Sequence, residues 1–268
     1  MRKMLHNILE RVFNVFILRK IEERFNRLDA NILDLKSLHM RESGREFSID
    51  TQHEFAFNSR DFTNPKGSKN DFTRSPSFVG SVNRMFGRSV SYLDIGCANG
   101  GLVNDFLVQG NVAIGIEGSD LGFVTKQDHW KVIPKTLFNA DVTKPFFMKK
   151  DSQPCTFDVI GAWEVLEHIQ EEDLDIFFEN VLNHLSDNSI FMASVAQFPD
   201  FDPQTGEAWH VTLKSRDWWF KLFEKYGLAP LPIPKNFPFP RGWGNPTVPD
   251  WDSKINPNLG FHVFLKRK

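Results

Sequence analysis

The sequence from Tyr92 to Gly101, YLDIGCANGG, decides the fold of this 268-residue chain. It begins in a predicted strand, Ser91–Ile95, runs into a glycine-rich turn, and leads to a predicted helix over Leu102–Val108. A strand, a glycine-rich turn and a helix in this order are typical of an open α/β sheet, where the glycines let the backbone approach a ligand at the carboxyl end of the strand. The stretch therefore predicts a fold class and the place of a ligand site.

From Ser91 onward, apolar strands alternate with amphipathic helices, which predicts an α/β domain with a mostly parallel, Rossmann-like sheet. The clearest helix is predicted from Glu171 to Leu185, because its apolar residues share one face. Another is predicted to begin at the N-cap Ser215 and to stop before Gly227. Further strands are predicted at Val112–Glu117, Leu137–Ala140, Phe157–Ala162, Ile190–Val195 and Phe261–Leu265.

An N-terminal amphipathic helix is predicted over residues 1–45. Its apolar residues from Leu18 to Leu35 are spaced as in a short coiled coil, which predicts a homo-oligomer. Packing on the chain's own domain is one alternative, and peripheral association of its basic first turns with a membrane is another. The apolar stretch Ile8–Leu18 is too short and too charged for a spanning helix.

Two further segments stand out by composition. Residues 46–77 are polar with scattered phenylalanines and are predicted to be a linker or a lid, so that the main domain is expected over 78–268. Residues 229–258 carry eight of the fifteen prolines and several aromatics. This insertion is expected either to contact a substrate or to cover the edge of the sheet.

Charge and cysteine content narrow the range of functions. The formal net charge of −2 disfavours a nucleic-acid partner that depends on a basic surface. The two cysteines, Cys97 and Cys155, form no metal-binding spacing and no disulfide framework, which favours the cytoplasm.

The glycine-rich turn admits two cofactors. Gly96, Ala98 and Gly101 approximate a dinucleotide motif, with Glu117 placed 21 residues beyond Gly96 as a ribose partner. The middle glycine that meets a pyrophosphate is absent, however. A carboxylate at Asp94 suits S-adenosylmethionine (SAM), whose sulfonium and ammonium are positive, better than it suits a dinucleotide.

The segment Asp94–Gly100 resembles the first SAM-binding motif of class I methyltransferases, and three further segments resemble later motifs of that family in the same order. By this resemblance Glu117 would hold the ribose hydroxyls, Asp141 would meet the adenine edge, and Phe157–Ile169 would contain the fourth-strand motif. The resemblance implies a SAM-dependent methyltransferase. It assigns to the cofactor Asp94, Gly96, Cys97, Ala98, Asn99, Gly100, Glu117, Gly118, Asp141, Val142 and Trp163.

Four residues are candidates for catalysis or metal binding. Glu164, Glu167 and His168 would share a face if the chain turned helical after the fourth strand, and His210 follows the fifth strand. Together they suit Mg²⁺ or Mn²⁺, which would orient and acidify hydroxyl groups. Without a metal, Glu164, His168 or His210 would act directly, with a histidine as general base. The alternative is that these side chains only order the turn beside SAM.

The acceptor is predicted from looser resemblances. E-x-x-E-H with a later histidine resembles metal-dependent small-RNA 2′-O-methyltransferases, and E-V-L-E-H resembles ubiquinone-pathway O-methyltransferases. The run from His210 to Gly227 resembles methyltransferases encoded with glycan-assembly enzymes. The leading hypothesis is O-methylation of a sugar hydroxyl in a polysaccharide or a glycosylated small molecule. A quinone-like acceptor, RNA and a nonenzymatic scaffold are the alternatives.

Overall fold

A computed structural model describes residues 47–71, 73–241 and 259–268, which belong to one compact unit spanning residues 45–268. The helix predicted over residues 1–45 lies outside the described residues, together with the oligomer and membrane interactions predicted for it. Residues 242–258, most of the proline-rich insertion, also lie outside them.

The main sheet has seven strands in the order β4-β3-β2-β7-β8-β10-β9. Strands β4, β3, β2, β7 and β8 are parallel, whereas β10 runs antiparallel to both β8 and β9. The predicted mostly parallel α/β sheet is therefore confirmed. The strands span β2 Ser91–Ile95, β3 Val112–Glu117, β4 Leu137–Asn139, β7 Phe157–Trp163, β8 Leu185–Ala196, β9 Leu228–Pro230 and β10 Gly260–Arg267.

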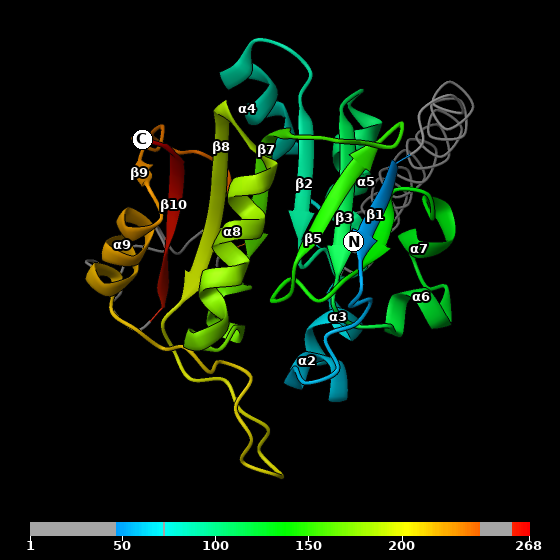
Figure 1. The fold of residues 1–268 in the computed structure, drawn as a ribbon, viewed down its shortest axis with the longest axis vertical. Helices are drawn as coiled ribbons and strands as arrows, with labels where there is room; N and C mark the ends of the chain where they lie inside the picture. The colour runs from blue at the N-terminus through cyan, green and yellow to red at the C-terminus, as the bar shows by residue number, and fades with distance from the viewer. Residues whose placement is uncertain (1–46, 72, 242–258) are drawn as a thin grey trace, which may run out of the picture. The chain divides into compact units, whose positions relative to one another are not determined.

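Helices cover both faces of the sheet. Successive side chains of a strand point to opposite faces, so each face packs against its own helices. Leu93 of β2 belongs to the same buried cluster as Phe177 of α8 (Leu174–His184), which crosses the face of the sheet turned toward the viewer in Figure 1. Its neighbour Tyr92 stacks on Phe106 of α5 (Gly101–Val108), with ring centroids 3.9 Å apart. Phe78 of α4 (Pro76–Phe86) packs edge-on against Phe106.

A second, three-stranded antiparallel sheet joins β1 (Phe47–Thr51), β5 (Phe146–Lys150) and β6 (Gln153–Pro154). It is tied to α8, since the Met148 backbone N–H donates to His184 Nε2 at 2.8 Å. Residues 46–77 are the segment predicted to be a linker or a lid, and its described part has regular secondary structure. That segment contains β1, α2 (Arg60–Thr63), α3 (Lys66–Asn70) and the start of α4.

Shorter elements complete the unit. Helices α6 (Leu121–Thr125) and α7 (His129–Val132) follow β3. The helix predicted from Glu171 begins instead as a 3₁₀ turn, Glu171–Asp173, and Leu185 already belongs to β8. The helix predicted after Ser215 is α9 (Arg216–Lys225), and the Ser215 side chain accepts a hydrogen bond from the Trp218 N–H, which confirms its capping role.

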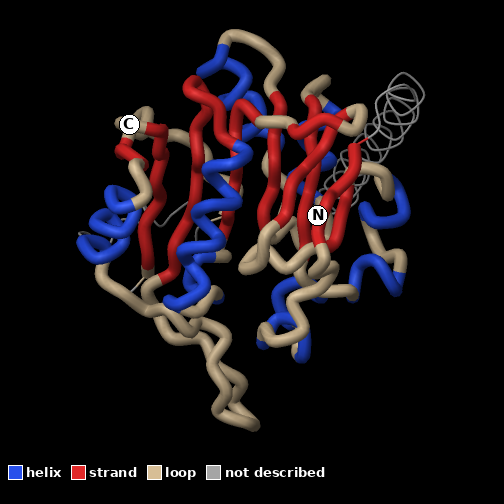
Figure 2. The backbone as a smooth tube through the Cα atoms, in the orientation of Figure 1, coloured by secondary structure: helices blue, strands red, loops and turns tan. Residues whose placement is uncertain are grey.

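The carboxyl ends of the parallel strands meet at one end of the sheet, where α2, α3 and long loops gather (Figures 1 and 2). This is the end at which open α/β sheets bind ligands. Across residues 47–71, 73–241 and 259–268, no helix has the length and apolar character needed to cross a membrane.

Candidate active site

The glycine-rich turn after β2 is tightly packed. Gly96 has φ +74°, and a Cβ there would lie 2.5 Å from the Val165 side chain. A Cβ on Gly101 would collide with the Thr73 carbonyl oxygen. Both positions require glycine because of what lies against them. The turn is consequently held between the loop after β7 and the segment that precedes α4.

Asp94 lies at the end of β2 with only 3% of its surface exposed. The Tyr92 hydroxyl donates to Asp94 Oδ1 at 2.8 Å and accepts from Trp163 Nε1 at 3.0 Å. Burial raises the pKa of Asp94 to about 7. A carboxylate in such surroundings is stabilised by a positively charged ligand.

Glu117, at the end of β3, holds three segments together. Its Oε2 accepts from the Ala98 N–H at 2.8 Å, and its Oε1 accepts from the Ser119 N–H at 3.0 Å and from Ser68 Oγ at 3.2 Å. Burial raises the pKa of Glu117. The carboxylate thus lies where the glycine turn, β3 and α3 meet.

Asp141 forms a local turn. Its Oδ1 accepts from the Thr143 N–H at 2.9 Å and from Thr143 Oγ1 at 2.6 Å, and its own N–H donates to the His53 carbonyl oxygen at 2.9 Å. The side chain is engaged through one of its two carboxylate oxygens.

A cavity of about 720 Å³ opens beside these acids. The predicted cofactor residues that line it are Gly96, Ala98, Glu117, Gly118, Asp141, Val142 and Trp163. Asp94 and Cys97 line a small lobe that shares Gly96 and Trp163 with the cavity. Asn99 instead donates to the backbone carbonyls of Ser68 and Asp71, and Gly100 is the N-cap of α5.

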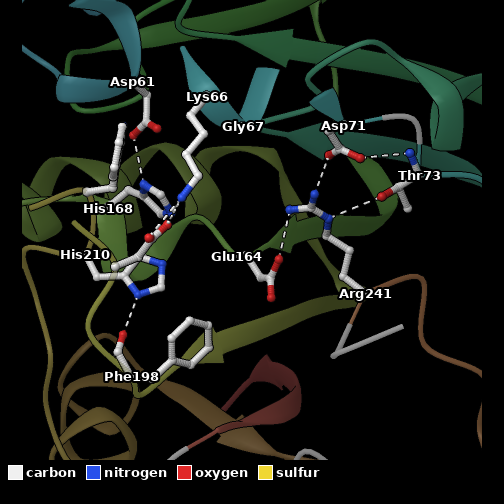
Figure 3. Close-up of a pocket in the computed structure, with 12 residues that line it drawn as sticks. Asp61, Lys66, Gly67, Asp71, Thr73, Glu164, His168, Phe198, His210 and Arg241 are labelled. Atoms are coloured by element: carbon white, nitrogen blue, oxygen red, sulfur yellow. Dashed lines mark hydrogen bonds and ion pairs between the residues drawn. The ribbon is translucent and has the colours of Figure 1, made fainter. Parts of the chain in front are cut away.

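A second cavity of about 560 Å³ adjoins the first and shares part of its wall. Figure 3 shows the polar side chains around it, which come from α2, α3, the loop after β7, the loop after β8 and the segment before β10. Its lining includes Asp61, Lys66, Asp71, Glu164, His168, Asp200, His210 and Arg241.

Glu167, His168 and His210 form a compact group, with ligand atoms within 4.8 Å of one another. His168 Nδ1 lies 2.8 Å from Asp61 Oδ2, and His210 Nδ1 lies 2.6 Å from the Phe198 carbonyl oxygen (Figure 3). As far as the described residues go, the Nε2 of each ring is left for a further partner.

Glu167 is fully buried, and burial raises its pKa to about 7. Its Oε1 accepts from the Ala196 N–H at 3.0 Å, whereas its Oε2 has no hydrogen-bond partner among the described residues. A buried carboxylate oxygen without a partner, next to two imidazole nitrogens, is a donor set that fits a divalent ion such as Mn²⁺.

Glu164 is not part of that group, and the expected helical face does not form. The chain makes a 3₁₀ turn at Leu166–His168, and Glu164 itself has φ +56°. This backbone directs Glu164 toward Arg241, whose Nη1 lies 2.9 Å from Glu164 Oε2. Burial raises the pKa of Glu164. Of the four predicted residues, three therefore form one group, and Glu164 lies beside it in an ion pair with Arg241.

Arg241 is a site residue that sequence reasoning missed. Besides Glu164, its guanidinium contacts Asp71 Oδ2 at 2.8 Å and Thr73 Oγ1 at 3.2 Å. The proline-rich insertion was expected to contact a substrate or to cover the sheet, but no motif marked this residue. Asp61, Lys66 and Asp200 were also missed, because only the folded chain brings them together.

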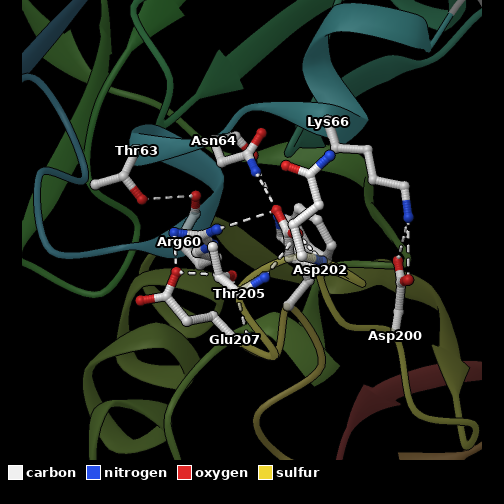
Figure 4. A network of polar contacts seen from close by, with 10 residues as sticks. Arg60, Thr63, Asn64, Lys66, Asp200, Asp202, Thr205 and Glu207 are labelled. Atoms are coloured by element: carbon white, nitrogen blue, oxygen red, sulfur yellow. Dashed lines mark hydrogen bonds and ion pairs between the residues drawn. The ribbon is translucent and has the colours of Figure 1, made fainter.

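We call residues 59–74 the cover. Polar contacts tie the cover to the loop after β8 (Figure 4). Arg60 pairs with Asp202 and Glu207, Lys66 pairs with Asp200 at 3.0 Å, and Trp209 Nε1 donates to the Asn64 carbonyl oxygen at 3.1 Å. Residues of both segments, among them Lys66 and Asp200, line the second cavity.

Comparison with known families now assigns the protein to a class. Residues 39–231, more than half of the chain, match a family described as a methyltransferase domain. The chain belongs to this methyltransferase family. It is a SAM-dependent enzyme, and the predictions of its class and of SAM as its cofactor are confirmed. The dehydrogenase and scaffold alternatives are thereby set aside.

Solved structures agree on the fold. The glycopeptide N-methyltransferase MtfA, complexed with SAM, aligns with a TM-score of 0.51 at 13% identity, covering 73% of this chain and 95% of that one. A SAM-dependent methyltransferase from Clostridium acetobutylicum aligns with a TM-score of 0.52 at 13% identity, covering 77% and 95%. At this identity the likeness shows the fold alone. None of the curated proteins compared with the chain matches it.

Proposed function

We propose that this methyltransferase transfers the methyl group to a hydroxyl, and that the hydroxyl belongs to a sugar in a polysaccharide or in a glycosylated small molecule. The observation that carries the proposal is the group of Glu167, His168 and His210 beside the second cavity, which shares part of its wall with the first cavity, where we expect SAM to bind.

A neutral hydroxyl is a weak nucleophile and needs a base to take its proton, whereas a neutral amine is already nucleophilic. When bound, SAM supplies an electrophilic methyl group. Burial lowers the pKa of His210, so its ring is neutral at pH 7 and its Nε2 can accept a proton from an acceptor in the second cavity. At His168 the lowering effect of burial is outweighed by Asp61 and Glu167, which raise the pKa.

The same three residues would hold a divalent ion if one takes part. Glu167 Oε2 and the two ring nitrogens provide the ligands, and the Nδ1 contacts to Asp61 and the Phe198 carbonyl would orient the rings. Such an ion would lower the pKa of a bound hydroxyl.

The lining of the second cavity supports a polyol acceptor. It is lined by carboxylates at Asp61 and Asp200 and by cations at Lys66 and Arg241, and such groups can hydrogen-bond to several hydroxyls. Asp61 pairs with His168, Lys66 with Asp200 and Arg241 with Glu164, and all of these groups are partly exposed. A planar, apolar quinone would displace water from them without offering hydrogen bonds in return. The carboxylates would repel the phosphates of an RNA chain.

A methyl-transfer assay with labelled SAM tests the proposal on four acceptor classes: oligosaccharides, quinols, short RNA and amino compounds, each with Mn²⁺ and with a chelator. We expect transfer to sugar oxygen and a fall in kcat of about 100-fold in His210→Ala with unchanged SAM affinity. His53→Ala, outside both cavities, is the control. Transfer only to nitrogen, quinol or RNA would refute the sugar acceptor.

We further propose that the enzyme works in the cytoplasm. Support comes from Cys97 and Cys155, which are free thiols in the described part of the chain. Cell fractionation tests this proposal. Activity released from membranes by salt would instead indicate peripheral association with the inner face of the membrane, and activity outside the cell would contradict the proposal.

A further inference from the structure

The small lobe beside Asp94 contains groups of both charges. Its lining includes Asp71, Thr73, Asp94 and Trp163, together with Arg241. Arg241 is the one cation among the described residues that line this lobe, and it also lines the two larger cavities. A cation at this junction can contact a ligand of either cavity.

The methionine part of SAM carries an α-ammonium and an α-carboxylate, which need partners of opposite charge. Asp94, buried and adjacent to the glycine turn, suits the ammonium. A carboxylate in the same lobe would lose its hydration, so it requires a charged donor or several N–H groups. Near Asp94, Arg241 is the side chain with that chemistry.

We propose that Arg241 binds the α-carboxylate of the SAM methionine. A guanidinium has five N–H donors. The three contacts with Glu164, Asp71 and Thr73 use one nitrogen each, Nη1, Nη2 and Nε. With respect to the described part of the chain, two N–H groups, one on Nη1 and one on Nη2, are therefore left for a ligand carboxylate.

The backbone of Arg241 is anchored before any ligand binds. Its carbonyl oxygen accepts from His262 Nε2 at 2.8 Å, and the His262 ring stacks on Phe239 with centroids 3.7 Å apart. Phe239 also packs against Phe264 of β10. Because the guanidinium is held as well, as Figure 3 shows, little conformational entropy remains to be lost on binding.

The surrounding carboxylates suit the charge of the whole ligand. Asp71, Asp94 and Glu164 lie around one guanidinium, whereas SAM brings a sulfonium, an ammonium and a carboxylate, a net charge of +1. Arg241 matches the anionic group, and the acids offset the cationic groups. This binding role rests on SAM as the methyl donor and is independent of the acceptor.

Calorimetric titration with SAM and with decarboxylated SAM tests the proposal, because the two ligands differ at the carboxylate. The wild-type protein is expected to bind decarboxylated SAM about 10- to 100-fold more weakly than SAM. In Arg241→Ala, the affinity for SAM is expected to fall by a similar factor relative to the affinity for decarboxylated SAM, so that the two ligands bind alike. Equal weakening of both ligands would mean that Arg241 only holds the cover, and would overturn the proposal.

Two further variants complete the test. Arg60→Ala removes a cation that belongs to the cover and pairs with Asp202 and Glu207, and it should change the affinity for both ligands by the same factor. Arg241→Lys should restore part of the preference for SAM, because it keeps the charge but not the planar fork. A preference for SAM that persists in Arg241→Ala, with a raised KM for the acceptor, would assign Arg241 to the acceptor and overturn the proposal. Failure of the wild type to bind SAM would contradict the choice of donor instead.

Discussion

Asp94 is a buried carboxylate that the fold tolerates at a cost in stability. Its pKa rises from the ordinary value of 3.8 to about 7, so the folded protein holds this proton more tightly than the unfolded chain. Its contribution to stability is therefore full below about pH 4 and is lost as the pH rises through about 7. Tyr92, Asp71, Glu117, Cys97 and Arg241 are the titratable or charged groups that act on it.

We predict that Asp94→Asn stabilises the protein without SAM at pH 8 by about 2 to 4 kcal/mol, since the amide is neutral and can still accept from Tyr92. The gain should vanish near pH 4, where the wild-type carboxyl is protonated. Urea unfolding at both pH values measures it, and SAM affinity at pH 8 should fall.

Asp158→Asn is the matched control, for which we expect the opposite change in stability at pH 8. At Asp158 the effect of burial is outweighed by hydrogen bonds from Arg88 and Ser91, which lower its pKa. This variant should lose stability at pH 8. A loss of stability in Asp94→Asn at pH 8 would contradict the description of Asp94.

At the scale of residues, sequence reasoning found the strand-end acids but not their partners. The place of Asp94 and Glu117 at the ends of strands followed from the motif. The hydrogen bond from Ser68 to Glu117 could not be predicted from the motif, because Ser68 lies in the cover, far from Glu117 in the sequence. The left-handed backbone of Glu164 was missed because the spacing of E-x-x-E-H suggests a helix.

At the scale of elements, buried parallel strands were the most predictable. Strands β2 and β3 have the predicted bounds, because each is a short apolar run between turn residues. Strand β1 was missed because its partner β5 is distant in the sequence. Helix α4 was not predicted, although its sequence has a proline at the first helical position and Gly87 at the end, which together indicate a helix.

We predict that Ser215→Ala lowers the free energy of unfolding by about 1 kcal/mol, because it removes the side-chain acceptor at the start of α9. Thermal or urea unfolding measures the loss. Ser215→Asp keeps an acceptor at the same position and should retain most of the stability. If Ser215→Ala unfolds like the wild type, the cap is not a stabilising feature of α9.

At the scale of the whole molecule, the active site is assembled from distant parts of the chain. The cover contributes Asp61 and Asp71, the loop after β7 contributes Glu164 to His168, the loop after β8 contributes His210, and Arg241 precedes β10. Local sequence patterns identified the loops after β7 and β8, because both follow predicted strands. The cover and Arg241 could not be placed, since their positions depend on long-range ion pairs.

The cofactor cavity carries the central claim, and calorimetric titration of the protein with SAM and, separately, with NADH tests it most directly. We predict saturable binding of SAM, no binding of NADH, and an affinity for SAM that falls about 10- to 100-fold in a folded Glu117→Ala variant. Preference for NADH, or SAM affinity unchanged by the loss of Glu117, would contradict the placement of the cofactor in the cavity between β2, β3 and the cover.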